Sequence, residues 1–211
     1  MDDHPVVRDG LRAIINEEPD LHVCGEAAGP GAAIATILST LPDLVLVDLS
    51  LSGGSGMELL KDMAIRHPSL PALVVSMHDE AIYAERVLRA GARGYLTKAE
   101  TSQSLLKAIR QVLDGKVYVS EVVMSSIVSK MGKQRQTTPP IEQLSDRELQ
   151  VFELMGTGLS TADIAERMHV SIKSVQKYIE RAKEKFGAST LKDLLREAFR
   201  WQDQQPTVDD D

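Results

Sequence analysis

Two short aliphatic runs, LVLV at 44–47 and LVV at 73–75, place the strictest limit on how this chain can fold. Neither run alternates apolar with polar residues, so each predicts a strand that is buried on both of its faces. Mixed runs at 21–27 (LHVCGEA) and 92–97 (ARGYLT) predict two more strands. Strands covered on both faces are typical of parallel sheets, in which helices connect one strand to the next.

Helical spacing of apolar residues fills the intervals between these runs. The predicted helices cover residues 6–15, 31–41, 56–67, 79–91 and 102–115. Regular alternation of strand and helix favours βαβ units, and therefore a parallel sheet with helices on both faces. We predict an α/β domain of this kind over residues 1–117.

The second half of the chain carries no strand signal. Residues 118–143 are predicted to form a linker, in which an amphipathic helix is followed by a polar, proline-bearing and flexible segment. Residues 144–201 are predicted to form a small all-α domain, because four short helical patterns follow one another there. The residues that precede these patterns are of the helix-capping type: Ser145, Ser160, Ser171 and Thr190. The acidic residues 202–211 have little apolar surface to bury and are predicted to be disordered.

Charge is unevenly distributed along the chain, whose net charge is −7. Residues 171–187 hold five basic residues against two acidic ones, whereas the first 120 residues are acidic overall, which suggests two domains with different partners. No apolar run reaches about 18 residues and no signal peptide begins the sequence, so we expect a cytoplasmic protein that does not enter a membrane. The single Cys24 excludes an internal disulfide, and no Cys/His cluster has the spacing of a zinc site.

Asp48 ends the first aliphatic run and is followed at once by a Ser and Gly-rich loop. A strand-end aspartate often only starts a loop or caps a helix, but chemistry in parallel sheets gathers at the carboxyl ends of strands. Asp2 and Asp3 precede the first helix. Ser76 ends another strand, and Lys98 follows a third. Three converging carboxylates need a counter-ion, and Mg²⁺ suits such hard oxygen ligands.

These side chains together predict phosphoryl chemistry. With Mg²⁺ bound, the carboxylate of Asp48 can attack a phosphoryl group, and Lys98 can stabilise charge on the phosphoryl oxygens. Ser76 can donate a hydrogen bond to a new phosphoryl oxygen, and Tyr95 can follow by changing its rotamer. The pattern therefore predicts a phosphorylation switch.

Four segments, DDHPVVRDGLR, LVLVDLSLSGGSGMELL, VVSMHDE and AGARGYLTK, resemble in this order the receiver domain of two-component response regulators. The helical half, LSDRELQVFELMGTGLSTADIAERMHVSIKSVQKYIERAKEKFG, resembles the LuxR-type helix-turn-helix domain. Together they are similar to the NarL/LuxR-type response regulators over nearly the whole chain. The resemblance implies a flavodoxin-like parallel sheet followed by a small all-α DNA-binding domain.

The resemblance also implies roles for residues of the first domain. Asp48 is implied to be the phosphorylation site, and Lys98 to contact the phosphoryl group. Ser76 and Tyr95 are implied to be the switch pair. The implied Mg²⁺ ligands are Asp2, Asp3, Asp48 and Ser50.

The sequence departs from the receiver pattern at its start, because receivers carry an apolar strand ahead of the paired acids and this sequence opens at Met1. In the flavodoxin-like order 2-1-3-4-5 that strand is the central one, between residues 21–27 and 44–48. Without it we expect a gap in the sheet and unpaired backbone, which is costly. Our hypothesis is that the sequence is truncated. If it is not, the ammonium of Met1 is expected beside the acidic pair, where it would compete with Mg²⁺.

The second helix of a helix-turn-helix pair lies in the major groove of DNA. Here that helix is predicted over residues 172–186, with a core-facing apolar stripe and a basic outer face. A charged, solvated face is the commoner meaning of such a pattern, but the motif context favours DNA binding. The candidate DNA-binding residues are Lys173, Ser174, Gln176, Lys177 and Arg181. Glu180 is expected to repel phosphates unless it pairs with Lys177 or Lys183.

The leading hypothesis is a DNA-binding response regulator, not an enzyme, which a sensor histidine kinase phosphorylates on Asp48 to control transcription. Its expected partners are the kinase, promoter DNA, RNA polymerase and a second copy bound through the receiver, the last helix or both. The alternative is a phosphorylation-independent regulator whose degenerate receiver serves in dimerisation or ligand sensing. A phosphatase of the haloacid-dehalogenase kind is disfavoured, because Ser50 stands where those enzymes carry a second acid.

Overall fold

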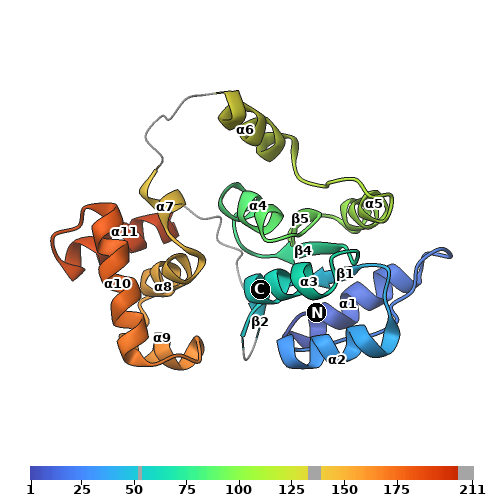
Figure 1. The fold of residues 1–211 in the computed structure, drawn as a ribbon, viewed down its shortest axis with the longest axis horizontal. Coiled ribbons are helices and arrows are strands. Elements are labelled where there is room, and N and C mark those ends of the chain that lie inside the picture. The colour runs from blue at the N-terminus through green and yellow to red at the C-terminus, as the bar shows by residue number, and fades with distance from the viewer. Residues whose placement is uncertain (52–53, 133–138, 204–211) are drawn as a thin grey trace. The chain divides into compact units, whose positions relative to one another are not determined.

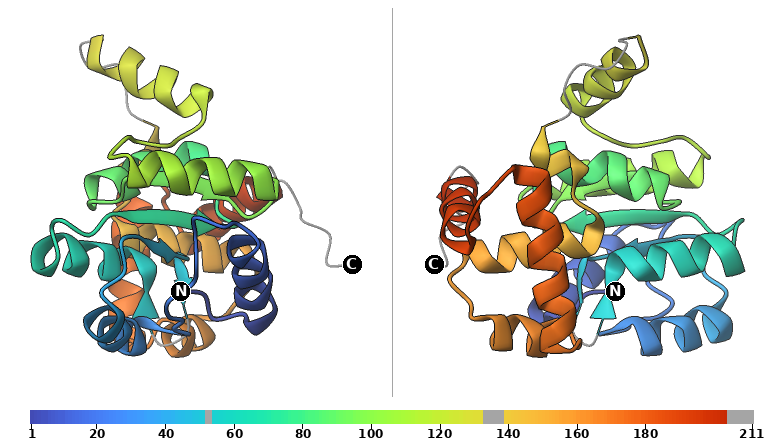
Figure 2. Two further views of the ribbon diagram at one scale, coloured as in Figure 1. Left: turned by 90° about the vertical axis from the view of Figure 1, so that its right-hand side faces the viewer. Right: turned by 60° about the vertical axis from the view of Figure 1, so that its left-hand side comes forward.

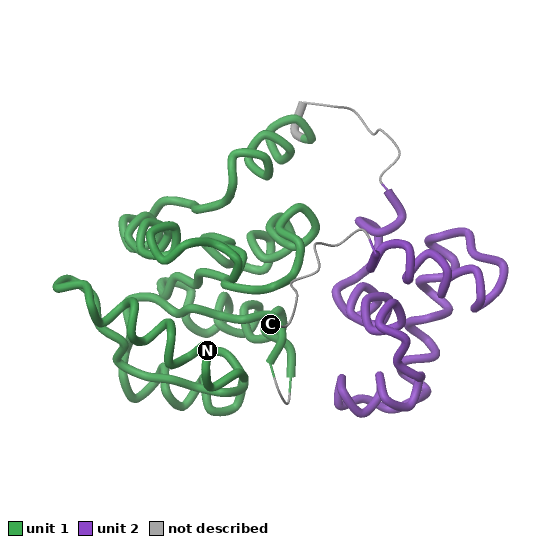
Figure 3. The backbone as a smooth tube through the Cα atoms, turned by 180° about the vertical axis from the view of Figure 1, so that it is seen from behind, with its two compact units in different colours: residues 1–133 green, residues 134–211 purple. Residues whose placement is uncertain are grey.

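The computed structural model describes residues 1–51, 54–132 and 139–203 of the chain. The chain forms two compact units, Met1–Lys133 and Gln134–Asp211 (Figure 3). Residues 118–132, which we assigned to the linker, belong to the first unit. The predicted domain limits at residues 117, 143 and 201 stay predictions.

The first unit is built around a parallel sheet in the order β1-β4-β5 (Figure 1). Its strands are β1 (Val45–Val47), β4 (Ala72–Ser76) and β5 (Gly94–Thr97). The two aliphatic runs supply β1 and β4, and every residue of β4 is buried, as an uninterrupted apolar run predicts. A short antiparallel hairpin, β2 (Ser50–Leu51) with β3 (Gly54–Ser55), follows this first strand after Asp48.

Helices lie on both sides of these strands (Figure 2). The helices of the first unit are α1 (Pro5–Asn16), α2 (Pro30–Thr40), α3 (Gly56–Arg66), α4 (Glu80–Arg89), α5 (Ser102–Leu113) and α6 (Glu121–Gly132), of which α6 lies against α4. Helices α1 to α5 begin and end within two residues of the predicted limits. Leu73 and Leu96 of the sheet pack with Ile15 of α1 and with the buried face of α5. The predicted α/β architecture is confirmed.

The prediction of a strand over residues 21–27 is wrong, because the structure has no strand there. A strand needs a neighbour that accepts and donates its backbone hydrogen bonds, and the neighbour expected for this segment is the central strand of the sheet. Leu21 and Val23 nevertheless pack against the core beside the sheet. The apolar residues of the segment therefore contribute to the core, although its backbone is not paired as a strand.

The first two residues of the chain lie beside the end of β1, at the place predicted for the end of the central strand. The ammonium of Met1 donates a hydrogen bond to the carbonyl of Leu46 at 2.9 Å, and the N–H of Asp48 donates to the carbonyl of Met1 at 3.0 Å. On the other side, the N–H of Asp2 donates to the carbonyl of Ala27 at 3.2 Å. These bonds fix Asp2 beside the end of β1.

The second unit is helical. It consists of α7 (Pro140–Gln143), α8 (Asp146–Gly156), α9 (Thr161–Arg167), α10 (Ile172–Phe186) and α11 (Leu191–Asp203). The short α7 lies within the predicted linker, and α11 extends two residues beyond Trp201. Residues 204–211 of the predicted tail lie outside the described residues. Among the described residues, no helix combines the length and apolar character needed to cross a bilayer.

The predicted capping residues begin the last four helices. Each of their hydroxyls accepts a hydrogen bond from a backbone N–H in the first turn of the helix that follows. The four capping residues are Ser145, Ser160, Ser171 and Thr190. Gly187 ends α10 in the left-handed region, with φ of 65°, where a residue without a side chain is favoured. The core of the unit contains the fully buried Phe152, whose ring lies 4.7 Å from that of Phe186.

Candidate functional site

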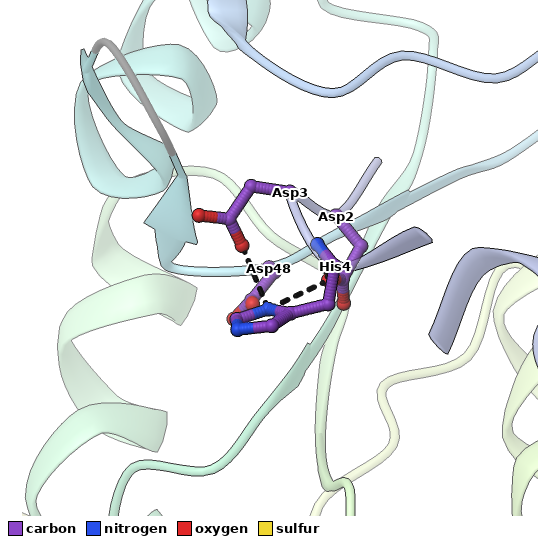
Figure 4. Close-up of side chains that lie close together, drawn as sticks. All are labelled: Asp2, Asp3, His4 and Asp48. Carbon is purple, nitrogen blue, oxygen red and sulfur yellow. Dashed lines mark hydrogen bonds and ion pairs between the residues drawn. The ribbon is translucent and has the colours of Figure 1, made fainter. Parts of the chain in front are cut away.

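Three aspartates come together at the carboxyl end of β1. Asp48 follows that strand directly, and the backbone bonds of Met1 and Asp2 bring the N-terminal residues beside it. Ligand atoms of Asp2, Asp3, His4 and Asp48 all lie within 4.8 Å of one another, and their side chains point toward one another (Figure 4). Asp2 and Asp48 are buried, with exposed fractions of 1% and 2%. The predicted convergence of acids from two segments is present.

Lys98, which follows β5, contacts two of these acids. Its Nζ lies 2.6 Å from Oδ2 of Asp2 and 2.7 Å from Oδ2 of Asp48. Burial would lower the pKa of the Lys98 ammonium, but its hydrogen bonds to both carboxylates outweigh burial and leave the pKa above 10.5. Lys98 therefore stays charged and neutralises part of the acid cluster.

His4, which was expected to pack beside the acidic loop, contacts both of the N-terminal aspartates. Its Nδ1 lies 2.8 Å from Oδ1 of Asp3 and 3.4 Å from Oδ1 of Asp2, and its backbone N–H donates to Asp2 at 2.9 Å. The only signal in the sequence is its position directly after the paired acids. Figure 4 shows the ring beside the carboxylates, with dashed lines to Asp3 and Asp2.

The ammonium of Met1 was expected beside the acidic pair, and its hydrogen bond goes to the carbonyl of Leu46. Burial lowers the pKa of this ammonium, although the nearby charges of Asp2 and Asp48 oppose the shift. The terminal nitrogen therefore serves as a backbone donor within the sheet.

The donor set of the cluster fits a hard divalent cation. Three carboxylates supply oxygen atoms within 4.8 Å of one another, and the ammonium of Lys98 offsets only part of their negative charge. Oxygen ligands and this charge suit Mg²⁺. Ser50, the fourth predicted ligand, donates its N–H to Oδ1 of Asp48 at 3.3 Å, while its hydroxyl lies 3.0 Å from Nε2 of His78.

The predicted switch residues lie on the two neighbouring strands, β4 and β5. Ser76 at the end of β4 and Tyr95 on β5 are fully buried. The hydroxyl of Tyr95 donates to the backbone carbonyl of His78 at 2.6 Å. Burial raises the pKa of Tyr95 well above its ordinary range. Tyr95 is therefore a neutral donor, and His78, which we had not assigned, connects it to Ser50.

In the second unit, α10 presents a charged face. Val175, Ile179 and Ala182 are buried on its core side. The predicted DNA-binding residues that are exposed are Lys173, Gln176, Lys177 and Arg181. Ser174, the fifth, is half-buried, and its N–H and hydroxyl are engaged by the capping Ser171.

Two other basic residues of α10 are engaged within the protein. Lys183 contacts Glu180 at 3.0 Å, so the acid expected to repel phosphates is paired with one of the two lysines named for it. Lys185 contacts the buried Glu148 at 2.5 Å and also donates to the carbonyl of Gln143 at 2.9 Å. Burial would raise the pKa of Glu148, but hydrogen bonds from Lys185 and from the α8 cap lower it overall.

The first unit is a parallel α/β unit with acids and a lysine at the carboxyl ends of its strands. The second unit is helical, and its helix α10 presents a basic face. Together they define a receiver coupled to a helix-turn-helix domain. Comparison with known families agrees: the response regulator receiver domain matches residues 1–110, and the luxR family of bacterial regulatory proteins matches residues 142–198. The chain belongs to the NarL/LuxR-type response regulators, which are DNA-binding regulators of two-component systems.

Particular relatives cover nearly the whole chain. Oxygen regulatory protein NreC of Staphylococcus aureus (strain JH9) is 34% identical over 205 residues, which is 94% of each protein. The RcsB response regulator of Salmonella typhimurium is 25% identical, with a TM-score of 0.71 over 94% of each chain. RcsB bound to the promoter P1flhDC in the presence of the phosphomimetic BeF3- is 26% identical, with a TM-score of 0.66 over 93% of this chain and 95% of that one.

Proposed function

We propose that a sensor histidine kinase phosphorylates this regulator on Asp48, and that phosphorylation controls its binding to promoter DNA. The observation that carries the proposal is the convergence of Asp2, Asp3 and Lys98 on the buried Asp48 at the end of β1. A single acid at a strand end has many uses, but this combination is suited to accepting a phosphoryl group. Because promoter DNA is the proposed ligand, we place its action in the cytoplasm.

In the proposed transfer, a carboxylate oxygen of Asp48 forms a bond to phosphorus while the bond from phosphorus to the donor's imidazole nitrogen breaks. The released imidazole takes up a proton from solvent. Asp2, Asp3 and Asp48, with Ser50 as predicted, would hold Mg²⁺. The ion, when bound, supplies positive charge that offsets repulsion between the carboxylates and the phosphoryl oxygens.

Lys98 and the switch pair have separate roles in this proposal. The Lys98 ammonium, already 2.7 Å from Asp48, is placed to contact a phosphoryl oxygen. Ser76 would donate its buried hydroxyl to the phosphoryl group. Tyr95 would then leave the His78 carbonyl, since the loop that follows Ser76 moves. Its proposed role in signalling is a change of rotamer.

For DNA binding, we propose α10 as the reading helix. Lys173, Lys177 and Arg181 would contact phosphates, and Gln176 would contact a base edge. Ser174 would contribute indirectly, because its hydrogen bond with Ser171 caps the start of α10. RcsB has been described on a promoter in the presence of a phosphomimetic, which supports the order of events proposed here.

We further propose that the active form is a homodimer, paired through the receiver, through α11 or through both. Helix α11 exposes Leu191 and Phe199, with exposed fractions of 45% and 46%, and such side chains suit a second apolar face. A dimer would match a pseudo-palindromic promoter site and could there meet RNA polymerase. Regulation of transcription, and not metabolic catalysis, is the proposed role.

Phosphotransfer from acetyl phosphate in the presence of Mg²⁺ tests the proposal. The wild-type chain should take up one phosphoryl group, detected by intact mass and by retarded migration on a phosphate-affinity gel. Asp48→Asn should take up none. Asp43→Asn, which changes an exposed aspartate close by in sequence, should behave like wild type. Absence of uptake by wild type would instead favour the phosphorylation-independent regulator.

A further inference from the structure

Helix α6 lies against α4. The N–H of Ser120, just before α6, donates to Oε1 of Glu80 at 2.8 Å. Nζ of Lys130 lies 3.0 Å from Oε2 of Glu85. Val123 is buried, with 6% exposed, although both of its neighbours on α6 are exposed. We call these five residues the α4–α6 contact, and Figure 1 shows the two helices near each other at one edge of the first unit.

The segment that leads into α6 is attached to the switch strand. The N–H of Tyr95 donates to the carbonyl of Tyr118 at 2.8 Å, and the N–H of Tyr118 donates to the carbonyl of Arg93 at 3.0 Å. Gly94, between them, makes this approach possible, because a Cβ there would lie 2.7 Å from the carbonyl oxygen of Tyr118. Tyr95 is thus joined through its backbone to the segment that begins α6.

The start of α4 is attached to the same tyrosine through His78. The hydroxyl of Tyr95 donates to the His78 carbonyl at 2.6 Å, and the His78 ring lies 4.6 Å from the ring of Tyr83 on α4. Nε2 of His78 also lies 3.0 Å from the hydroxyl of Ser50, two residues after the proposed phosphorylation site. A change at Asp48 that moves Ser50 or Tyr95 therefore reaches α4 through His78.

We propose that this face of α4 is a docking surface for α6, that the docked state restrains DNA binding, and that phosphorylation of Asp48 releases α6. The inference rests on the proposed phosphorylation. When Tyr95 leaves the His78 carbonyl, the first turn of α4 loses its anchor, and Glu80 in that turn separates from Ser120. The contact also includes the partly exposed ion pair of Lys130 with Glu85 and the buried Val123, and contacts of these kinds are weak enough to be reversible.

Release changes the length of the tether between the two units. With α6 docked, the first unit holds the chain as far as Lys130, whereas after release its last fixed point is Tyr118 beside β5. A longer tether lets two DNA-binding units reach two half-sites together, because the distance that a linker spans sets the effective concentration of the second unit. The docked helix thus limits paired binding to DNA through the length of the tether.

Val123→Asp tests the docking, with Val122→Asp as its matched control. Val122 precedes it on α6 but is 76% exposed, so an aspartate there stays in water. We expect Val123→Asp to accelerate amide hydrogen exchange in residues 121–132 at least tenfold and to raise affinity for duplex DNA without any phosphoryl donor. Val122→Asp should change neither quantity.

The ion pair offers a second and milder comparison. Lys130→Gln and Arg89→Gln each remove a cation that contacts Glu85, but only Lys130 crosses from α6 to α4. Only Lys130→Gln should accelerate exchange in α6. Faster exchange in Val123→Asp without a gain in DNA affinity over Val122→Asp would overturn the restraint. Unchanged exchange in Val123→Asp would overturn the docking itself.

Phosphorylation of the wild-type chain separates this inference from the proposed function. Acetyl phosphate and Mg²⁺ should accelerate exchange in α6 of the wild type and leave Asp48→Asn unchanged. If Asp48 takes up phosphate and exchange in α6 stays the same, the release is wrong while the proposed function stands. If Asp48 takes up no phosphate, both the proposed function and the phosphate-driven release are wrong, and Val123→Asp still decides whether α6 restrains DNA binding.

Discussion

Nζ of Lys98 lies 2.7 Å from Oδ2 of Asp48, although the two residues are 50 positions apart in the sequence. The same ammonium lies 2.6 Å from Asp2. One cation therefore joins the end of β5 to the end of β1 and to the start of the chain. It also keeps two buried carboxylates compatible with the folded state.

Replacing Lys98 by alanine should destabilise the first unit strongly. The carboxylates of Asp2 and Asp48 would be left buried without their counter-charge, which costs on the order of 3–5 kcal/mol. Mg²⁺ should restore part of the loss, because an ion bound only by the folded state stabilises it. Urea unfolding with Mg²⁺ or with a chelator measures both effects. Lys116→Ala, at an exposed pair with Asp114, should cost less than about 1 kcal/mol, and equal losses in the two variants would contradict this account.

Lys177→Ala should weaken binding to duplex DNA and lower the salt dependence of binding. An exposed lysine that neutralises one phosphate contributes about one unit to the slope of log affinity against log salt. Fluorescence anisotropy over a salt series gives both quantities on random-sequence DNA, so no target site is needed. Lys116→Ala removes the same charge from the receiver, and the assignment of α10 fails if both variants have the wild-type slope.

Lys185→Gln should destabilise the second unit in a pH-dependent manner. The folded-state pKa of Glu148 lies below its ordinary 4.5, so the stabilisation is present above that value and is lost as pH falls through the folded pKa. The free energy of unfolding of the variant should be roughly 1–3 kcal/mol lower than that of the wild type at neutral pH, since Lys185 is partly exposed. This difference should become smaller below about pH 4.5.

Denaturant unfolding from neutral to acidic pH measures the effect of Lys185→Gln. Lys183→Gln is the control, because Lys183 contacts Glu180, whose side chain is 66% exposed, and should cost no more than about 0.5 kcal/mol. A deficit of Lys185→Gln that stays constant with pH would exclude the Glu148 pair as its cause.

An added strand ahead of Met1 should stabilise the first unit. Met1 pairs with Leu46 and Asp48 on the edge of β1, and the N–H of Leu46 and carbonyl of Leu44 are the next positions in that parallel register. Five fused aliphatic residues should form these bonds, each contributing about 0.5–1.5 kcal/mol, and should raise the melting temperature. Amides of residues 21–27 should gain protection from exchange. A Gly/Ser extension of equal length should do neither, and identical melting temperatures of the two extended chains would refute the predicted pairing with β1.

Much of the fold follows from local patterns in the sequence. Helix α10 has its predicted limits, and the serines at 145, 160 and 171 cap the helices that they were expected to begin. The buried strands β1 and β4 followed from uninterrupted aliphatic runs. Such features depend on neighbours within a few residues, so one sequence is enough to predict them.

Other features depend on partners distant in the sequence. Residues 21–27 have strand-like composition but lack the pairing that makes a strand, and composition alone does not reveal that. The contacts of His78 with Ser50 and Tyr95 arise where three strand ends meet, and nothing near His78 in the sequence indicates them. Glu180 had two lysines at suitable spacing, and only the packed helix shows that its partner is Lys183.

The most direct test of the central claim is the affinity of the full chain for a duplex selected by the chain itself from random sequences, measured with and without acetyl phosphate and Mg²⁺. The account predicts that phosphorylation raises the affinity of the wild type at least tenfold and leaves Asp48→Asn unchanged. Equal affinities of wild type with and without one phosphoryl group on Asp48 would contradict it.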